Sequence, residues 1–221
     1  MMHRQSFPRW FGLAVAFAAG CLPAFWQPAW GATSQTYDFK VFLGNDEIGH
    51  QRFDVSMEGR RTRVRIDAQF TVKIFYIPVY RYRHRNDETW EDGCLREIQA
   101  ETDDNGDSFF VRGLYRDGRV AVQTHSGNWS EEGCVKTFAY WNRDWITEGR
   151  LLNSQTGELQ PAKLRTIGQD TISVHGVPTR TTHRQIITDK FTIDLWYTLV
   201  GKWVALQSTT SKGDILRYVL Q

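Results

Sequence analysis

Apolar and polar side chains alternate with a two-residue period through most of this sequence. The clearest run is residues 64–76, where Ile66 and Phe70 share one side of the alternation and Arg65 and Asp67 share the other. Successive side chains of a β-strand point to opposite faces, so the pattern predicts a strand with one buried face and excludes a one-sided helix. Thirteen residues at ~3.3 Å each make a strand about 40 Å long. That length favours a strongly curled sheet.

A hairpin is predicted next, with its turn at Ile77-Pro78-Val79. We expect the returning strand to place Tyr82 opposite Ile74 and His84 opposite Val72. A slip of one residue would set arginines against the apolar row, so the side-chain pattern selects which face is buried. The inner face of the returning strand then carries Tyr82, His84, Glu88 and Trp90, and its outer face carries Arg81, Arg83 and Arg85.

Turn signals punctuate the rest of the chain at intervals that suit strands. They are Gly44-Asn45-Asp46, Glu58-Gly59, Asp92-Gly93, Asn105-Gly106, Asp117-Gly118, His175-Gly176, Gly201-Lys202 and Gly213-Asp214. Later strands are predicted over residues 171–175, 177–187, 191–198, 203–209 and 215–220. No interval carries an amphipathic helix of three turns, which disfavours parallel βαβ units. The expected fold is therefore mainly β, a single antiparallel meander curled into an open or incomplete barrel.

Residues 140–157 depart from this alternation and are rich in aromatic and loop-forming side chains. A short helix or loop excursion is expected here, with the helix near residues 143–148. Trp141 and Trp145 are four residues apart, so a helix would place both rings on one side. Two roles remain open for this segment. It is either a gate at one mouth of the incomplete barrel, with Tyr140 and Asn142 at the rim, or a hydrophobic plug that stabilises the sheet.

The first 31 residues have the pattern of an export signal. Arg4 and Arg9 give a basic start, residues 11–19 form an uncharged apolar run, and small residues stand at both cleavage positions of Ala29-Trp30-Gly31. Nine apolar residues are too few to span a bilayer as a helix, which takes about 20. We expect a signal peptide at residues 1–31 and a single periplasmic β domain at residues 32–221. A lipid anchor at Cys21 is the alternative to a soluble protein.

Composition narrows the classes of partner. The chain has 221 residues, 41% of them apolar, which is enough for a substantial core. Arg4 and Arg9 are the only charged residues of the expected signal, so the remainder carries 25 basic and 25 acidic side chains. A neutral domain argues against nucleic acid or an anionic membrane surface as the main partner.

Two cysteines, Cys94 and Cys134, remain after the expected signal. An even number in an oxidising compartment favours a disulfide between them, and two separate buried thiols are the alternative. No His or Cys lies near either one at a spacing that metal ligation needs. We therefore expect no metal site and no cofactor.

No sequence signature of a catalytic or phosphate-binding site occurs in the chain. His84 is the most conspicuous polar residue on an apolar face, and two interpretations of it are a hydrogen-bonded structural histidine and a polar contact for a ligand. The candidate ligand-binding residues are Tyr82, His84, Glu88, Trp90, Tyr140, Trp141, Asn142 and Trp145.

Three stretches together resemble a family of exported bacterial proteins classed as a domain of unknown function. They are GCVKTFAYWN at residues 133–142, LLNSQTGE at residues 151–158 and DLWYT at residues 194–198. The resemblance implies a bacterial periplasmic β-protein and no particular activity. The expected architecture is also similar, more weakly, to the incomplete barrels of periplasmic lipoprotein carriers.

Long curled strands with aromatic inner faces can enclose a cavity. The leading hypothesis is a non-catalytic periplasmic binder or carrier of an apolar molecule, such as a lipid or acyl chain. The second is a structural or assembly partner of another envelope protein, with no ligand cavity. A hydrolase has the least support, because no catalytic constellation is visible in the sequence.

Overall fold

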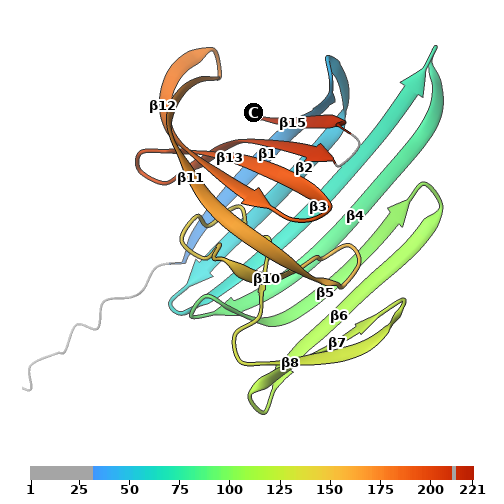
Figure 1. Ribbon diagram of the computed structural model, residues 1–221, viewed down its shortest axis with the longest axis vertical. Helices are drawn as coiled ribbons and strands as arrows, with labels where there is room; N and C mark the ends of the chain where they lie inside the picture. Colours follow the sequence, from blue (N-terminus) through green and yellow to red (C-terminus); the bar gives the residue numbers. More distant parts are fainter. Residues whose placement is uncertain (1–31, 211–212) are drawn as a thin grey trace, which may run out of the picture.

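The computed structural model describes residues 32–210 and 213–221, and all strands of that part of the chain belong to one curled sheet (Figure 1). The expected signal peptide and Cys21 lie outside the described residues. The strands are β1 (Thr33–Leu43), β2 (Asp46–Glu58), β3 (Arg61–Ile74), β4 (Ile77–Glu91), β5 (Cys94–Asp104), β6 (Asp107–Arg116), β7 (Arg119–Thr124), β8 (Gly127–Glu132), β9 (Lys136–Thr137), β10 (Gly149–Leu152), β11 (Leu159–Val174), β12 (Val177–Ile187), β13 (Phe191–Thr198), β14 (Trp203–Thr210) and β15 (Ile215–Leu220).

The sheet is a meander, as the sequence predicts. Strands β1 to β8 pair with their neighbours in sequence, and so do β10 to β15. Strand β15 pairs antiparallel with β1, which joins the two runs into one sheet. Within the described residues only the short β9–β10 pair is parallel. The fold is mainly β and the sheet is not closed into a barrel, which confirms the expected fold class.

Side chains, not backbone ladders, bridge the open side of the curl. The indole nitrogen of Trp129 on β8 donates to the carbonyl of Gly157, 2.9 Å away. Arg150 on β10 forms an ion pair with Glu131 on β8. The edge strand β8 is therefore tied to the segment that enters β11, and we call the resulting curled sheet the half-barrel.

The hairpin of β3 and β4 buries the predicted face but has a different register. Tyr82 pairs with Phe70, four residues from the expected partner Ile74. The predicted turn at Ile77-Pro78-Val79 is wrong, because Phe75 and Tyr76 make the turn with φ of 49° and 71°. A two-residue turn with both φ positive matches the twist of the flanking strands. Alternation alone assigned Tyr76 to the strand.

The face prediction for this hairpin is confirmed, because a shift of four residues leaves each side chain on its own side. His84 is buried and Arg83 is exposed. Acids match several outward arginines of these strands, for example in the ion pairs Arg65–Asp87 and Arg85–Asp67.

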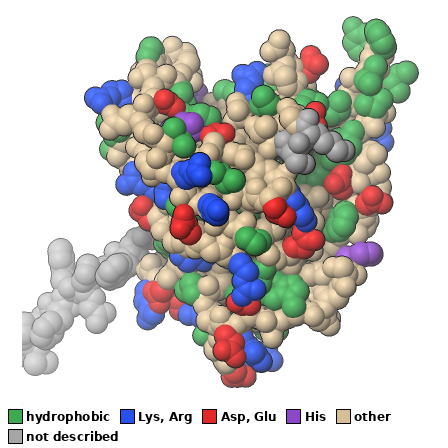
Figure 2. Space-filling view, viewed as in Figure 1, with side chains coloured by type: hydrophobic (Ala, Val, Ile, Leu, Met, Phe, Trp, Pro, Cys, Tyr) green, Lys and Arg blue, Asp and Glu red, His purple; other side chains and the backbone are tan. Residues whose placement is uncertain are grey.

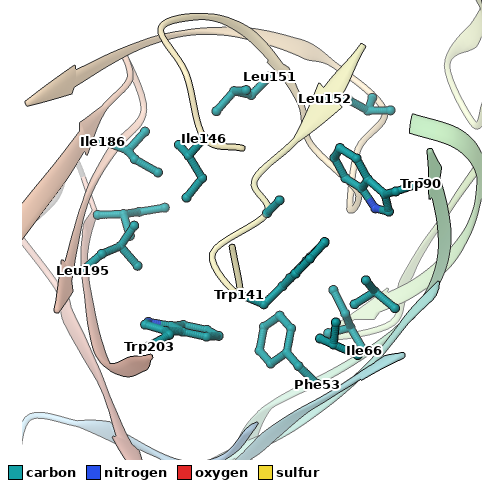
Figure 3. Packing of buried hydrophobic residues seen from close by; sticks show 14 of the residues in the cluster. Phe53, Ile66, Trp90, Trp141, Ile146, Leu151, Leu152, Ile186, Leu195 and Trp203 are labelled. Atoms are coloured by element: carbon teal, nitrogen blue, oxygen red, sulfur yellow. The ribbon is translucent and has the colours of Figure 1, made fainter. Parts of the chain in front are cut away.

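The core lies inside the half-barrel, around residues 134–157, which we call the inner segment. Figure 3 shows residues of this segment packed between the two walls of the curl. The inner segment contributes Trp141, Ile146, Leu151 and Leu152, one wall contributes Phe53, Ile66 and Trp90, and the other contributes Ile186, Leu195 and Trp203. A smaller apolar cluster is made by Val41, Ile48, Ala68 and Phe70.

The helix expected near residues 143–148 does not form. The stretch is a series of turns, in which the amide of Trp145 donates to the carbonyl of Asn142 and the amide of Asp144 to the side chain of Asn142. The carbonyls of Tyr140 and Trp141 accept hydrogen bonds from tyrosine hydroxyls of the surrounding strands. These hydrogen bonds tie the chain just before the stretch to the surrounding strands.

Candidate functional site

A cavity of about 210 Å³ lies inside the half-barrel, and residues of both apolar clusters line it. Its walls come from β2, β3, β4, β13, β14, β15 and the inner segment. Five of the eight predicted site residues belong to these walls, namely Tyr82, His84, Glu88, Tyr140 and Trp141. The fold thus brings residues of β4 and of the distant inner segment to one shared space.

The aromatic wall is built around Phe70 and Tyr82, whose rings stack at 5.2 Å. Because these two residues are a cross-strand pair of the β3–β4 hairpin, the register fixes the stack. Tyr140 and Tyr218 also line the cavity, and burial raises the pKa of both phenols as well as that of Tyr82. These three hydroxyl groups are therefore neutral at physiological pH.

His84 is the main polar group of the β4 wall. Its Nδ1 lies 2.8 Å from the hydroxyl of Thr102, and its Nε2 lies 3.4 Å from the hydroxyl of Ser154. Burial lowers the pKa of His84 from 6.5 to about 4. The imidazole is consequently neutral at pH 7, and it links β4, β5 and the inner segment.

The turn at residues 153–157 positions two polar side chains over the cavity. The side-chain oxygen of Asn153 accepts from the amides of Gln155 and Thr156, which fixes the turn locally. Ser154 then reaches His84, and Gln155 accepts a hydrogen bond of 3.2 Å from the hydroxyl of a cavity tyrosine, Tyr82. The LLNSQTGE stretch is thus the part of the inner segment that completes the polar wall.

Glu88 is buried and faces the same cavity. It accepts hydrogen bonds from the side chains of Asn86 at 2.9 Å and Trp90 at 2.8 Å. Desolvation raises the pKa of its carboxyl group, which favours the uncharged form. The predicted site residue Trp90 therefore orients Glu88 and does not itself line the cavity.

Three tryptophans pack together beside the cavity. The rings of Trp90, Trp141 and Trp145 contact one another at centroid distances between 5.1 and 5.9 Å. Trp145 does not line the cavity, and neither does Asn142, whose side chain serves the adjacent turn. Trp141 does line it, and its indole N–H has no hydrogen-bond partner within the described part of the chain.

The contact between Ser154 and His84 has the residue types of a nucleophile and its base. An efficient general base has a pKa near the working pH, whereas that of His84 is about 4. The group at its other nitrogen is the neutral hydroxyl of Thr102, while triads of this type use a carboxylate to stabilise the imidazolium. His84 and Ser154 therefore lack two features that activate a nucleophile in sites of this type.

A family model described as a domain of unknown function, DUF6134, matches residues 39–221. The chain belongs to this family. Comparison of the sequence with curated proteins gave no match. Among solved structures, the fold of this DUF6134 protein is similar to a β-barrel-like protein of domain of unknown function DUF1849 from Brucella abortus. The TM-score is 0.64 at 9% identity, over 84% of this chain and 94% of that one, so the likeness concerns the fold alone.

The predicted disulfide is present in the DUF6134 protein, where Cys94 and Cys134 are bonded. It joins the start of β5 to the start of the inner segment, next to a backbone hydrogen bond from Leu95 to Val135. The GCVKTFAYWN stretch therefore leads from this anchor to the cavity residues Tyr140 and Trp141.

Sequence reasoning missed a polar cluster on β11–β13 around His183. Its Nε2 lies 2.7 Å from Asp194, its Nδ1 lies 3.1 Å from Asp170, and its ring stacks on Trp196 at 4.6 Å. Asp194 and Trp196 belong to the DLWYT stretch and alternate with the buried Leu195 and Tyr197. Asp194, the single charged residue of its strand, was the signal that could have revealed this cluster.

Two common kinds of feature, a membrane-spanning helix and a cluster of metal-ligating side chains, are not found in the described residues. Within residues 32–210 and 213–221, no helix has the length and apolarity that crossing a membrane requires. In the same ranges, no group of three or more His, Cys, Asp or Glu side chains is arranged to hold a metal ion.

Proposed function

We propose that this DUF6134 protein is an exported, non-catalytic binder of a small apolar molecule held in the cavity of the half-barrel. The observation that carries the proposal is the half-open cavity of about 210 Å³, whose walls combine aromatic rings with polar side chains. An apolar protein cavity of about 150 Å³ holds benzene, and drug-sized ligands occupy about 300–1,000 Å³. The guest is therefore a molecule of one or two rings or a short acyl segment, and a whole lipid is too large.

The polar groups of the cavity define the rest of the guest. His84 and the three phenols are neutral and burial favours the uncharged form of Glu88, so an anionic guest would find no counter-charge among these groups. The hydroxyl and amide side chains of Tyr82, Ser154 and Gln155 line the cavity and can exchange a hydrogen bond with a guest. An uncharged guest with one polar atom fits this set of groups.

Two features support export as part of the proposal. Disulfides persist in oxidising compartments such as the periplasm, and Cys94 is bonded to Cys134. Residues 1–31 have the basic start, apolar run and small cleavage residues of a signal peptide. A periplasmic protein with a removed signal is the form we propose for the working molecule.

Fluorescence titration with 1-naphthol, a two-ring probe with one hydroxyl group, tests the binding site. Ser208→Leu places a larger, apolar side chain in the cavity wall. We expect it to weaken binding of 1-naphthol by a factor of about ten or more, which corresponds to about 1.4 kcal/mol of binding free energy. Ser173→Leu makes the same change on the exposed part of β11 and serves as the matched control. Equal affinity in both variants would contradict the proposed site.

Native mass spectrometry of the purified protein tests the proposal without a chosen probe. We expect a small co-purifying molecule in the wild type that is absent from Ser208→Leu. If the wild type carries no such molecule and also fails to bind 1-naphthol, the proposal is wrong and the role of an assembly partner in the cell envelope takes its place.

A further inference from the structure

The end of the β3–β4 hairpin is a free-standing ribbon. The ladder between β2 and β3 ends at Phe70, and the ladder between β4 and β5 ends at Tyr82. Residues 71–81, which we call the ribbon, form their strand pairs only with one another, and at the base of the ribbon the backbone of Arg81 is hydrogen-bonded to Asn105. Figure 1 shows this hairpin projecting beyond the neighbouring strands at the upper right of the molecule.

The tip of the ribbon is apolar and open to solvent. Phe75 is 91% exposed and Tyr76 is 95% exposed. Ile74, Ile77 and Val79 are exposed beside them, and Figure 2 shows hydrophobic side chains gathered at this end of the molecule. Single exposed apolar residues are ordinary on protein surfaces, whereas a contiguous group marks an interaction site.

The residue types at the tip are unusual for the turn that they form. Four other turns of the chain have the same pair of positive φ values, and each places Gly second: Asp92-Gly93, Asn105-Gly106, Asp117-Gly118 and His175-Gly176. Asn-Gly and Asp-Gly suit such turns because both positions need φ above zero. Phe75 and Tyr76 adopt that conformation with side chains that bury almost nothing. Neither the backbone conformation nor packing within the described residues accounts for aromatic side chains at these two positions.

The charge of the ribbon points to an anionic surface. Residues 71–81 contain Lys73 and Arg81 and no acid. None of the ion pairs found among the described residues involves either cation. The acids Asp103 and Asp104 of β5 lie at the base of the ribbon, where they accept hydrogen bonds from the amide of Gly106 and the hydroxyl of Tyr80. A neutral total charge argues against an anionic membrane as the main partner of the whole domain, but it does not describe this local patch.

We propose that the ribbon inserts its aromatic tip into the interface of a lipid bilayer that contains anionic headgroups. Aromatic side chains favour the level of the headgroups, and nearby basic residues add attraction to anionic lipid. A second copy of the chain is a poorer partner, since a stable protein interface uses about 20–30 residues a side and the exposed apolar tip offers five.

Docking through the ribbon would also place the cavity near the membrane. Phe70 and Tyr82, the pair at the base of the ribbon, are walls of the cavity. A guest that dissolves in the bilayer would then have a short route between the membrane and the cavity. This last step rests on the proposed function, whereas the insertion itself does not.

Vesicle co-sedimentation of the purified protein tests the insertion, with phosphatidylethanolamine vesicles prepared with and without phosphatidylglycerol. The variant Phe75→Asn with Tyr76→Gly replaces the aromatic turn by Asn-Gly, the pair already used at Asn105-Gly106. We expect partitioning to weaken by a factor of about ten or more, together with an unchanged or higher melting temperature because the new turn is relaxed. A role in the fold would lower the melting temperature.

Three further measurements complete the test. Val200→Ser removes a 92% exposed apolar side chain outside the ribbon and is expected to bind vesicles like the wild type. Lys73→Gln with Arg81→Gln is expected to remove the preference for phosphatidylglycerol. Ser208→Leu, which fills the cavity, is expected to bind vesicles normally, so this test does not depend on the guest.

Three results would overturn the insertion. The wild type stays in the supernatant with both kinds of vesicle, or the Asn-Gly variant binds as well as the wild type. The third result is a wild type that does not bind vesicles but associates with itself as its concentration rises, while the Asn-Gly variant does not self-associate. The tip would then be a contact between copies of the chain.

Discussion

A buried histidine makes the stability of this molecule sensitive to acid. His84 is 5% exposed, and its two hydrogen-bond partners are neutral hydroxyl groups, which do not stabilise a charged imidazolium as a carboxylate would. Its pKa of about 4 lies below the ordinary value of 6.5. The unfolded chain therefore takes up a proton at a pH where the folded chain still excludes it, and acid favours unfolding through this one residue.

The pH dependence follows from that difference. The stabilisation is fully present above pH 6.5 and is lost as the pH falls towards about 4. We expect the free energy of unfolding to fall by about 3 kcal/mol across this window, and His84→Gln to remove this loss. Burial raises the pKa of Glu88, whose contribution has the opposite sign and is lost as the pH rises. Urea unfolding of both proteins at several pH values measures the difference, and parallel pH profiles would exclude His84 as the cause.

Gly157 is required by its surroundings as well as by its backbone. Its φ is +76°, and an added Cβ would lie 2.2 Å from the Cγ2 of Thr124. Its carbonyl also accepts the hydrogen bond from Trp129 that bridges the open side of the half-barrel. A side chain here would push apart the two parts of the chain that the bridge joins.

Gly157→Ala is therefore expected to destabilise the protein by about 2–4 kcal/mol, which combines overpacking with an unfavourable φ. Thr124→Ser removes the clashing methyl group and keeps the hydroxyl that donates to the carbonyl of Gly127. We expect Gly157→Ala to cost less in the Thr124→Ser background. Chemical denaturation of the four proteins gives the coupling, and purely additive effects would show that the contact with Thr124 is not responsible.

At the scale of elements, the inner segment is tied to the sheet through two adjacent carbonyls in its aromatic part. The hydroxyls of Tyr37 and Tyr197 donate to the carbonyls of Trp141 and Tyr140, at 3.4 and 2.8 Å. The ring of Trp141 packs on Trp90 in the centre of the core. These contacts favour the plug over the gate, since a gate would need to leave them.

Trp141→Ala is the test of that distinction. A fully enclosed Trp lost from a packed core costs about 3–5 kcal/mol, and Trp141 is 5% exposed. We expect a loss of this size in thermal unfolding, together with weaker binding of 1-naphthol because one wall of the cavity disappears. Trp145 is only half-buried, so Trp145→Ala is expected to cost less. A small effect on stability with complete loss of binding would instead support the gate.

The sequence predicted those elements whose pattern is local. Strands β12, β13 and β15 have the predicted bounds, because local alternation and the neighbouring turn residues determine where each strand begins and ends. The β3–β4 turn was mispredicted because aromatic residues such as Phe75 and Tyr76 are typical of strands. Here they form a turn with two positive φ values, which Asn-Gly and Asp-Gly favour. The helix prediction was wrong because the stretch is organised as turns around Asn142, whose carbonyl and side chain accept from the amides of Trp145 and Asp144. Five of the eight candidate residues meet in one cavity: alternation identified Tyr82, His84 and Glu88 on the inner face, and the aromatic density of the inner segment pointed to Tyr140 and Trp141.

At the scale of the whole molecule, the disulfide fixes the inner segment to the sheet. Cys94 and Cys134 are separated by 40 positions in the sequence, and the loop between them includes β6, β7 and β8, the last strands at one edge. Closing a loop of that length stabilises a fold by about 3–4 kcal/mol in chain-entropy terms. We expect Cys94→Ser with Cys134→Ser to lower the free energy of unfolding by this amount. Reductant should reproduce the loss in the wild type and leave the variant unchanged, and equal stability of both proteins would contradict a structural role.

The pairing of β1 with β15 has a consequence for how the chain reaches its folded state. Phe39 lies opposite Leu220, so the first strand finds one of its two neighbours only when nearly the last residues are present. Pairings between such distant residues are slow to form, and partly formed sheets expose strand edges that promote aggregation. The facing edges of β1 and β14 stay open until β15 enters between them. A chain interrupted before β15 is therefore expected to remain open and to depend on chaperones, whereas the local hairpins of β3 to β8 can form early.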